Sequence, residues 1–413
     1  MVAPKEFDVI ISGAGPAGST CALFLAQKGR NVLLLEKETF PRDKICADNK
    51  TWKCLDIVKE LGLWDEFEKL PRARITGVLI TSPGGHELYT PLHPNDVEEK
   101  GPWYNVRRKT FDTMLARAAK RNPHITLNES CRVTTPIWEG KKVVGVTYLD
   151  KNGKENEARA RVVVGADGSQ SPIARAVGFP SKVKGRFATN TRAYFENIDV
   201  PANACRLYYL KGICPGYFWI FPVDEKTFNV GIGMRPEDIR KIGKSMTEYM
   251  EEIIRSPRFA PLFKSAQQVS EWEEWGVSVL GKRRPCAGDG WVLCGAAGTF
   301  AMPYSGEGCG PGMRTGKIAA HAIDACLTAN DVSRKGLKRY EDELWHVLQP
   351  EVSGFRWLEF LLLHEGVYDW VVQRAANNPK LIEMSSHMQN HYALSQKMIS
   401  PGTILSLLTT PPK

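Results

Sequence analysis

The sequence predicts an α/β (α+β) fold, in which a parallel nucleotide-binding sheet receives an inserted antiparallel sheet and is followed by a helical C-terminal region. Three observations support this prediction. Residues 7–36 have the pattern of a strand, a glycine-rich turn, a helix and a second strand. Residues 73–93 and 186–234 alternate in polarity or carry β-branched and aromatic runs, as strands do. Residues 333–399 have helical periodicity.

The first of these segments has the spacing of a dinucleotide-binding turn. The run G-A-G-P-A-G at residues 13–18 matches G-x-G-x-x-G, and an acid follows in the next strand. Gly13 makes the tight turn, Gly15 lets the backbone approach a pyrophosphate, and Gly18 allows the helix to pack on the strand. Glu36 is expected to accept a hydrogen bond from a ribose hydroxyl. This segment therefore predicts a Rossmann-like domain.

A polar loop at residues 39–48 precedes a helix expected over residues 50–61. Cys46 lies close in sequence to Lys44 and Arg42, two cations that can lower the pKa of a thiol. The sequence leaves two interpretations of Cys46 open, a reactive group or a structural thiol.

The next elements alternate between hairpins and helices. The turn P-G-G interrupts the strands of residues 73–93, and a helix is expected from about residue 104 to residue 120. A second hairpin over residues 143–164 ends in a buried strand, the turn Asp167-Gly168 and a helix at residues 172–177.

The run YFWIFP at residues 217–222 is apolar on both faces of a strand. Tyr217, Trp219 and Phe221 share one face, and Phe218 and Ile220 share the other. The first face can line a large hydrophobic cavity or belong to the core of the sheet.

The remainder of the chain carries a second glycine-rich turn. Glycines in residues 229–234 allow close approach of another group, and residues 237–256 are expected to form one amphipathic helix. A buried strand at residues 291–295 leads to the turn at residues 303–312, and a helix is expected over residues 313–327. Such a turn offers backbone N–H groups to an anionic ligand.

Composition restricts the classes of protein further. The net charge of +9 over 413 residues is mild, and no run of basic residues alternates with aromatic ones, so nucleic-acid binding is not expected. The ten cysteines form no C-x-x-C pair and no histidines have metal-ligand spacing, so we expect reduced thiols, a cytoplasmic location and no metal site. No signal peptide or transmembrane run is expected. The apolar surface of residues 358–372 is expected to pack on the protein or to contact a membrane peripherally.

Three separated motifs together resemble the FAD-binding fingerprints of proteins with the para-hydroxybenzoate hydroxylase fold. They are the turn at residues 13–18 with Glu36, the Asp167-Gly168 turn, and the P-x-x-G-E-G turn at residues 303–308. The resemblance implies FAD as cofactor and an R-x-x-F-D arginine, Arg108, that touches it. The cofactor-binding residues implied are Gly13, Gly15, Ala17, Gly18, Glu36, Lys37, Arg108, Asp167, Gly168, Ala296, Gly306, Glu307 and Gly308.

Within that group the chain is most similar to the geranylgeranyl reductases. The loop PRDKIC at residues 41–46 resembles their P-x-x-K-x-C motif, and residues 217–222 resemble their Y-x-W-x-F-P motif. Two positions depart from the family pattern. Ala47 replaces a glycine, and Ala296 replaces the aspartate that binds the ribityl chain, which removes about 1–3 kcal/mol of hydrogen bonding.

The resemblance implies a flavin-dependent oxidoreductase that reduces isolated C=C bonds of a geranylgeranyl chain in a lipid or diphosphate. Cys46, Tyr217 and Tyr304 are its expected catalytic residues, and Tyr217, Trp219 and Phe221 its expected substrate pocket. NADPH or a ferredoxin is the expected electron donor. A flavin monooxygenase acting on an aromatic or polyketide substrate and a non-catalytic lipid binder of the same fold are the alternatives.

The expected domains are discontinuous. Residues 1–72, 100–180 and 275–330 form the FAD-binding domain, residues 73–99 and 181–274 the substrate-binding sheet domain, and residues 331–413 the C-terminal helical region.

Overall fold

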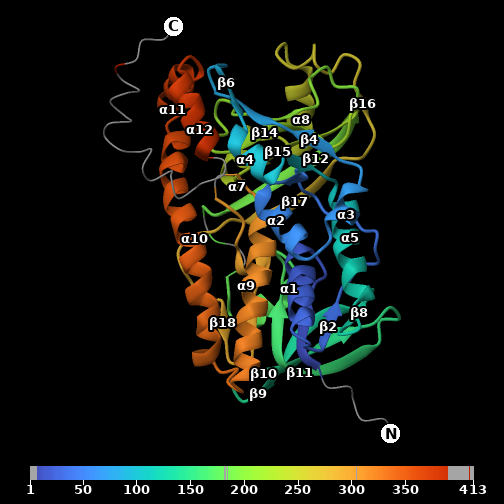
Figure 1. The fold of residues 1–413 in the computed structure, drawn as a ribbon. Coiled ribbons are helices and arrows are strands. Elements are labelled where there is room, and N and C mark those ends of the chain that lie inside the picture. Colours follow the sequence, from blue (N-terminus) through green and yellow to red (C-terminus); the bar gives the residue numbers. More distant parts are fainter. Residues whose placement is uncertain (1–6, 181–182, 184, 304, 389–408, 410–413) are drawn as a thin grey trace.

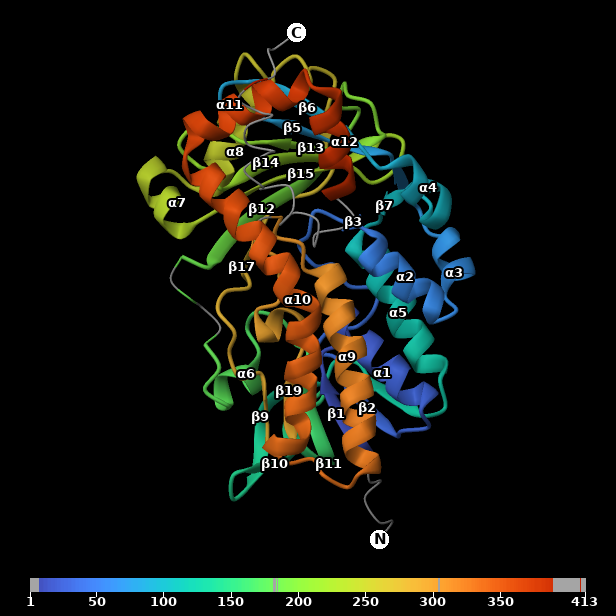
Figure 2. The same cartoon turned by 60° about the vertical axis from the view of Figure 1, so that its left-hand side comes forward.

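The computed structural model describes residues 7–180, 183, 185–303, 305–388 and 409. These residues form an elongated molecule with a lower lobe around a mostly parallel sheet and an upper lobe around an antiparallel one (Figure 1). The long helices α9 (Cys309–Thr328) and α10 (Arg334–Leu363) lie along the lower lobe, and α10 continues toward the upper lobe (Figure 2).

The lower sheet has the strand order β18-β19-β11-β1-β2-β8. Its central parallel strands, β1, β2 and the second half of β11, are buried on both faces, as expected where helices cover a sheet. The bounds are β1 (Phe7–Ser12), β2 (Val32–Leu35), β8 (Ile125–Asn128), β11 (Glu155–Gly165), β18 (Ala287–Gly288) and β19 (Trp291–Leu293). The first half of β11 pairs with β10 (Lys142–Leu149), which pairs with β9 (Arg132–Glu139), and the second half pairs with β1.

Helices α1 (Pro16–Gln27) and α9 lie side by side in the lower lobe (Figure 2). Their closeness depends on Gly316, where a Cβ atom would come within 2.3 Å of the Ala17 carbonyl oxygen. Helix α5 (Arg108–Arg121) also packs on α1, and α6 (Pro172–Ala176) packs on β9. The lower lobe thus unites segments from the beginning, the middle and the later part of the chain.

The upper sheet has the order β16-β12-β15-β14-β13-β5-β6, with β17 beside β12. Neighbouring strands are antiparallel except for β5 and β13. The bounds are β5 (Gly77–Thr81), β6 (Glu87–Pro91), β12 (Phe187–Glu196), β13 (Ala204–Tyr208), β14 (Tyr217–Pro222), β15 (Thr227–Met234), β16 (Gln267–Gln268) and β17 (Glu273–Ser278). The predicted hairpin at residues 73–93 is the pair β5–β6.

Helices cover both faces of the upper sheet. Phe218 and Ile220 of β14 pack in one cluster with Met250 of α8 (Met246–Arg255). On the other side, α11 (Glu365–Ala376) and α12 (Pro379–Met388) lie against β6. The single helix expected over residues 237–256 is wrong, because the left-handed Gly243 (φ +69°) separates α7 (Pro236–Ile242) from α8.

Smaller elements join the two lobes. The strands β3 (Asn49–Lys50), β7 (Trp103–Asn105) and β4 (Ala73–Ile75) form a three-stranded sheet. Around it lie α2 (Trp52–Glu60), α3 (Trp64–Glu68) and α4 (Pro94–Lys100), and a 3₁₀ turn, Gly295–Gly298, follows β19. Among the helices that the structure describes, none combines the length and the apolar character required to span a bilayer.

Candidate active site

One cavity of about 1480 Å³ extends through both lobes. Its polar end is built by turns and helix N-termini of the lower lobe. Its apolar end lies between the upper sheet and helices α11 and α12. The polar end includes Ser12, Gly15, Glu36, Arg108, Asp167 and Gly308. The apolar end includes Ile80, Leu88, Leu207, Val371, Leu381 and Met384.

The glycines of the first turn have different surroundings. A Cβ atom on Gly18 would lie 1.9 Å from the Gly13 carbonyl oxygen, and Gly13 itself has φ +96°. A Cβ atom on Gly15 would meet only an Arg42 nitrogen, at 3.5 Å, and Gly15 lines the cavity. Gly13 and Gly18 are therefore required for packing, whereas Gly15 leaves room for a ligand at the start of α1.

The Glu36 carboxylate is held in place at the end of β2. Its two oxygens accept hydrogen bonds from Ala14 N–H at 3.0 Å and Glu38 N–H at 3.1 Å. The side chain is buried in the folded chain but lines the cavity. Two lone pairs remain for the hydroxyl groups of a ribose.

Asp167 follows β11 and faces the same cavity. One carboxylate oxygen accepts a hydrogen bond from Ser12 Oγ at 2.7 Å, and the other, Oδ1, is buried without a hydrogen-bond partner among the described residues. Burial raises the pKa of Asp167 to about 6. A buried acceptor without a donor is costly, so this oxygen fits a ligand that brings hydroxyl groups.

The third turn connects the cavity to the start of α9. Gly306 has φ +65°, and a Cβ atom there would approach the Tyr217 hydroxyl at 3.8 Å. The Glu307 carboxylate accepts a hydrogen bond from Thr51 Oγ1 at 2.9 Å, which fixes the turn against α2. Helix α9 begins at Cys309, four residues before the expected start, so its N-terminus borders the cavity. Ala296 also lines the cavity and offers no carboxylate.

An ion-pair network lies under this polar end. Arg108 donates two hydrogen bonds of 2.6 Å to the fully buried Asp112, and Arg42 donates a third, of 2.7 Å, to the same carboxylate. These guanidinium groups hold the pKa of Asp112 below its usual range against the opposing effect of burial. Asp112, which the sequence did not single out, therefore fixes both arginines at the cavity wall.

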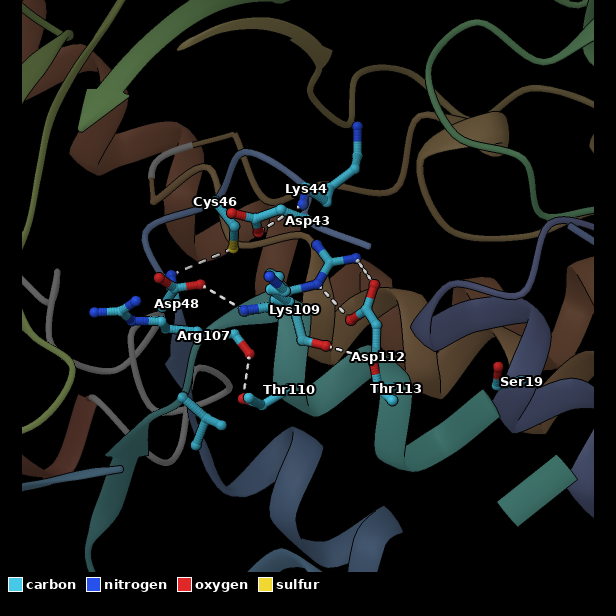
Figure 3. A network of polar contacts seen from close by, with 12 residues as sticks. Ser19, Asp43, Lys44, Cys46, Asp48, Arg107, Lys109, Thr110, Asp112 and Thr113 are labelled. Carbon is cyan, nitrogen blue, oxygen red and sulfur yellow. Dashed lines mark hydrogen bonds and ion pairs between the residues drawn. The ribbon is translucent and has the colours of Figure 1, made fainter. Parts of the chain in front are cut away.

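The loop that carries Cys46 is fixed at both sides. Arg192 Nη2 donates to Asp43 at 2.7 Å. Asn229 Nδ2 donates to the Cys46 carbonyl oxygen at 2.6 Å and to Asp48 at 2.8 Å. Asp48 is fully buried and also accepts hydrogen bonds from the Tyr194 hydroxyl and from the backbone N–H at the start of α5. Figure 3 shows Asp48 beside Cys46.

The two cations near Cys46 have other neighbours. Arg42 is paired with Asp112, as above. The Lys44 ammonium lies 3.5 Å from the centre of the Trp275 ring and points away from the Cys46 sulfur (Figure 3). Burial, with help from two nearby arginines, lowers the pKa of Lys44 to about 7. A lysine that titrates near neutrality in a cavity wall can hold or release a proton, a property that its sequence context did not reveal.

The aromatic strand β14 forms one wall of the cavity. Tyr217, Trp219 and Phe221 all line it, and the Tyr217 hydroxyl donates to the Ser305 carbonyl oxygen of the third turn at 2.5 Å. Trp219 Nε1 donates to Asn229 Oδ1 at 2.8 Å. Asn229 therefore connects the aromatic wall to the Cys46 loop.

The structure gathers the expected residues around this cavity. Of the expected cofactor-binding residues, all except Gly18 line it, and Gly18 lies beneath the turn. Cys46 and Tyr217 also line it, whereas Tyr304 lies outside the described residues. Asp48 and Arg192 were not anticipated, because their partners are distant in sequence. Asp112 was not singled out either, although one of its partners, Arg108, is only four residues away.

The chain is similar to known FAD-binding proteins over most of its length. Residues 6–349 match the family model described as an FAD binding domain. The chain is 33% identical to a digeranylgeranylglycerophospholipid reductase of Methanocella arvoryzae, over 83% of this chain and 84% of that one. It is 32% identical to digeranylgeranylglycerophospholipid reductase 2 of Methanopyrus kandleri, over 82% of each chain.

Two solved structures are also similar. A geranylgeranyl bacteriochlorophyll reductase-like protein from Thermoplasma acidophilum has a TM-score of 0.81 at 22% identity, with 96% of this chain and 99% of that one covered. A flavin-dependent brominase has a TM-score of 0.76 at 25% identity, with 96% and 98% covered. The first of these likenesses supports the fold.

Proposed function

Because this chain belongs to the FAD-binding family that includes archaeal digeranylgeranylglycerophospholipid reductases, we propose that it reduces isolated C=C bonds of a geranylgeranyl chain carried by a lipid or a diphosphate. The observation that carries the proposal is the continuity of the cavity. It begins at a dinucleotide turn and ends in an apolar space between the upper sheet and α11 and α12. A prenyl chain needs such a space beside the cofactor.

The polar end of the cavity fits FAD. Gly15 leaves space at the start of α1 for a pyrophosphate, Glu36 has lone pairs for a ribose, and Asp167 Oδ1 lacks a donor. Arg108 and the N-terminus of α9 would face the remainder of the cofactor. Reduced FAD supplies the hydride that saturation of an alkene requires.

The other half of the reaction requires a proton and the exclusion of water. An isolated alkene has no activating carbonyl group. The protein must therefore hold the prenyl chain in a fixed position beside the cofactor and provide an acid. We propose Cys46 Sγ as the group that holds this proton, with Lys44 Nζ as a second donor. The sulfur of Cys46 accepts the Asp48 N–H at 3.4 Å, and the hydrogen bonds to Asn229 keep its loop in place.

The aromatic wall positions the substrate in this proposal. Tyr217, Trp219 and Phe221 present flat apolar surfaces to the prenyl chain. The Tyr217 hydroxyl donates its hydrogen bond to the Ser305 carbonyl oxygen. The electrons for FAD would come from NADPH or a ferredoxin that docks transiently.

We further propose that the corner between α10 and α11 contacts the membrane from which the prenyl lipid is taken. Phe360, Leu363 and Val367 are large apolar side chains that are 47–53% exposed there, and Val367 also lines the cavity. Apolar surface of this kind can enter the headgroup region of a bilayer. Flotation with vesicles should therefore weaken in Phe360→Asp and Leu363→Asp but not in Trp138→Asp, an exposed position (41%) on β9 of the lower lobe. Equal flotation of all variants contradicts the contact.

The activity is tested with purified protein that has been loaded with FAD, reduced without oxygen and given a geranylgeranyl lipid. Mass spectrometry should show products heavier by two hydrogen atoms for each bond reduced. Cys46→Ala should keep the flavin spectrum and lose the product, whereas Cys326→Ala, at the far end of α9, should keep both. An unchanged substrate refutes the proposal. Oxygen uptake stimulated by an aromatic compound indicates a monooxygenase, and a protein that stays colourless with excess FAD indicates a non-catalytic binder.

A further inference from the structure

Three side chains that can ligate a metal meet at the edge of the upper lobe. His93 immediately precedes α4, and Glu383 and His387 lie one turn apart on α12. The ligand atoms of the three all lie within 4.8 Å of one another. The two imidazole rings are stacked, with centroids 3.8 Å apart and planes inclined by 29°.

The interactions within the described residues do not explain this arrangement. Neither imidazole forms an ion pair or a hydrogen bond with the Glu383 carboxylate, and none of the three side chains has such a bond to another described residue. Among the described residues, the nitrogen lone pairs of the two stacked rings and the negative charge of the carboxylate have no common partner. A divalent cation supplies that partner.

We propose that His93, Glu383 and His387 bind a divalent transition-metal ion of the zinc class and so tie α12 to the corner between β6 and α4. Two imidazoles and one carboxylate suit Zn²⁺ better than Mg²⁺ or Ca²⁺, which prefer oxygen ligands. Ligands that share one tetrahedral Zn²⁺ at 2.0–2.1 Å lie about 3.4 Å apart. The three side chains, one exposed and two half-buried, need to move by roughly an ångström to reach that spacing, and the two stacked rings need to rotate so that their in-plane lone pairs converge on the ion.

The surroundings of the three ligands indicate a structural role for the ion. Helix α12 is joined to β6 by Ser386 Oγ, which donates to the Pro91 carbonyl oxygen at 2.8 Å, and by a 3.2 Å contact of Ser385 with Thr90. Leu381, Met384 and Ser385 of the same helix line the apolar end of the cavity. Figure 2 shows α12 at the edge of the upper sheet, close to α4. A bound ion would hold this cover of the cavity closed.

The sequence offered no sign of this site. Glu383 and His387 are four residues apart, but their third partner lies 290 residues before Glu383. Spacing rules for metal ligands detect local pairs of cysteine and histidine, so they predicted no metal.

The test uses full-length protein without a histidine tag, treated with a chelator and then titrated with Zn²⁺ against a chromophoric chelator. We expect one equivalent to bind. His93→Gln and His387→Gln should each weaken binding by at least the 10–100-fold that loss of an outer-shell partner costs, and Glu383→Gln should also weaken it. His124→Gln, an exposed histidine, and Cys46→Ser, which removes the least buried thiol, should bind as the wild type does.

Thermal unfolding with and without Zn²⁺ is a second measurement, independent of the competition with the chromophoric chelator. Zn²⁺ should raise the unfolding temperature of the wild type and of His124→Gln, and should leave that of His93→Gln and His387→Gln unchanged, because only a binding-competent native state is stabilised. Circular dichroism is used to check that each variant is folded. If a histidine variant does not fold, Glu383→Gln, at an exposed position, serves as an independent variant. The proposal is overturned if the wild type binds no equivalent, if the histidine variants bind as tightly, or if Cys46→Ser removes binding.

Discussion

Substitution of Gly231 by alanine should disturb the substrate wall through a single ring. Gly231 lies on β15 directly opposite Trp219 of β14. A Cβ atom on Gly231 would lie 2.2 Å from Trp219 Cζ2 and 2.6 Å from the Thr191 carbonyl oxygen on the other neighbouring strand. Because ordinary contacts begin near 3.4 Å, the ring must move by 3.4 − 2.2 = 1.2 Å.

That displacement has a cost that can be worked out from the contacts. Overpacking of a closely packed site costs about 1–3 kcal/mol. A shift of 1.2 Å also breaks the 2.8 Å hydrogen bond from Trp219 to the buried Asn229, which costs about 1–3 kcal/mol more. The total is about 2–6 kcal/mol. Since Asn229 also holds the Cys46 carbonyl, the reactive loop should lose order together with the wall.

The prediction is checked by measuring the unfolding temperature of Gly231→Ala and its affinity for a prenyl lipid. Gly231→Ala should unfold at a lower temperature and bind the lipid more weakly. Gly366→Ala on α11, where an added Cβ meets nothing within 4 Å, should be neutral or stabilising by up to about 1 kcal/mol. The smaller ring of Trp219→Phe should relieve the clash with the ring but not the one with the Thr191 carbonyl oxygen, so the double variant should still be destabilised but should lose less stability than the sum of the two single variants. The reasoning is refuted if Gly231→Ala behaves like Gly366→Ala, or if the two substitutions are additive.

Three further predictions concern the cofactor end. Burial raises the pKa of Asp167 from 3.8 to about 6, so the free energy of unfolding of the FAD-free protein should fall by about 3 kcal/mol as the pH rises from about 4 to above 6, and urea unfolding of Asp167→Asn should lack that fall. Ala296→Asp should tighten FAD binding by about 1–3 kcal/mol, or roughly 5–150-fold, in a fluorescence titration, and an unchanged affinity would contradict the assignment of this position. Gly18→Ala places a Cβ 1.9 Å from the Gly13 carbonyl oxygen and should give no folded protein, whereas Gly15→Ala should fold but stay colourless when purified. Soluble yield and visible spectra distinguish the two.

Local patterns predicted most of the secondary structure. The strand, turn and helix at residues 7–36 are contiguous, so spacing alone identified them. Where tertiary structure decided the outcome, the prediction was less accurate. Amphipathic periodicity continues across residues 237–256, and it did not reveal that Gly243 adopts a left-handed conformation and ends α7. The start of α9 at Cys309 was missed because glycine and proline at residues 310–312 are poor helix formers outside the first turn.

In the site too, local motifs could be predicted from the sequence and long-range contacts could not. Motif residues such as Glu36 and Asp167 could be assigned because each belongs to a short turn of fixed spacing. The groups that hold the loop in place could not be assigned. Asp48 accepts from Tyr194, 146 residues away, and Asp43 accepts from Arg192, 149 residues away. Such pairs appear only once the two lobes are assembled.

The packing of α1 on α9 also governs how the protein is made. Strand β19 and helix α9 complete the lower lobe, yet they begin about 280–300 residues after β1 and α1. At a synthesis rate of 5–20 residues per second, the ribosome needs roughly 15–60 s to deliver them. During that interval the emerging chain exposes the flank of β11 and the face of α1 that the later segments cover, so we expect it to depend on chaperones until the last third has been translated.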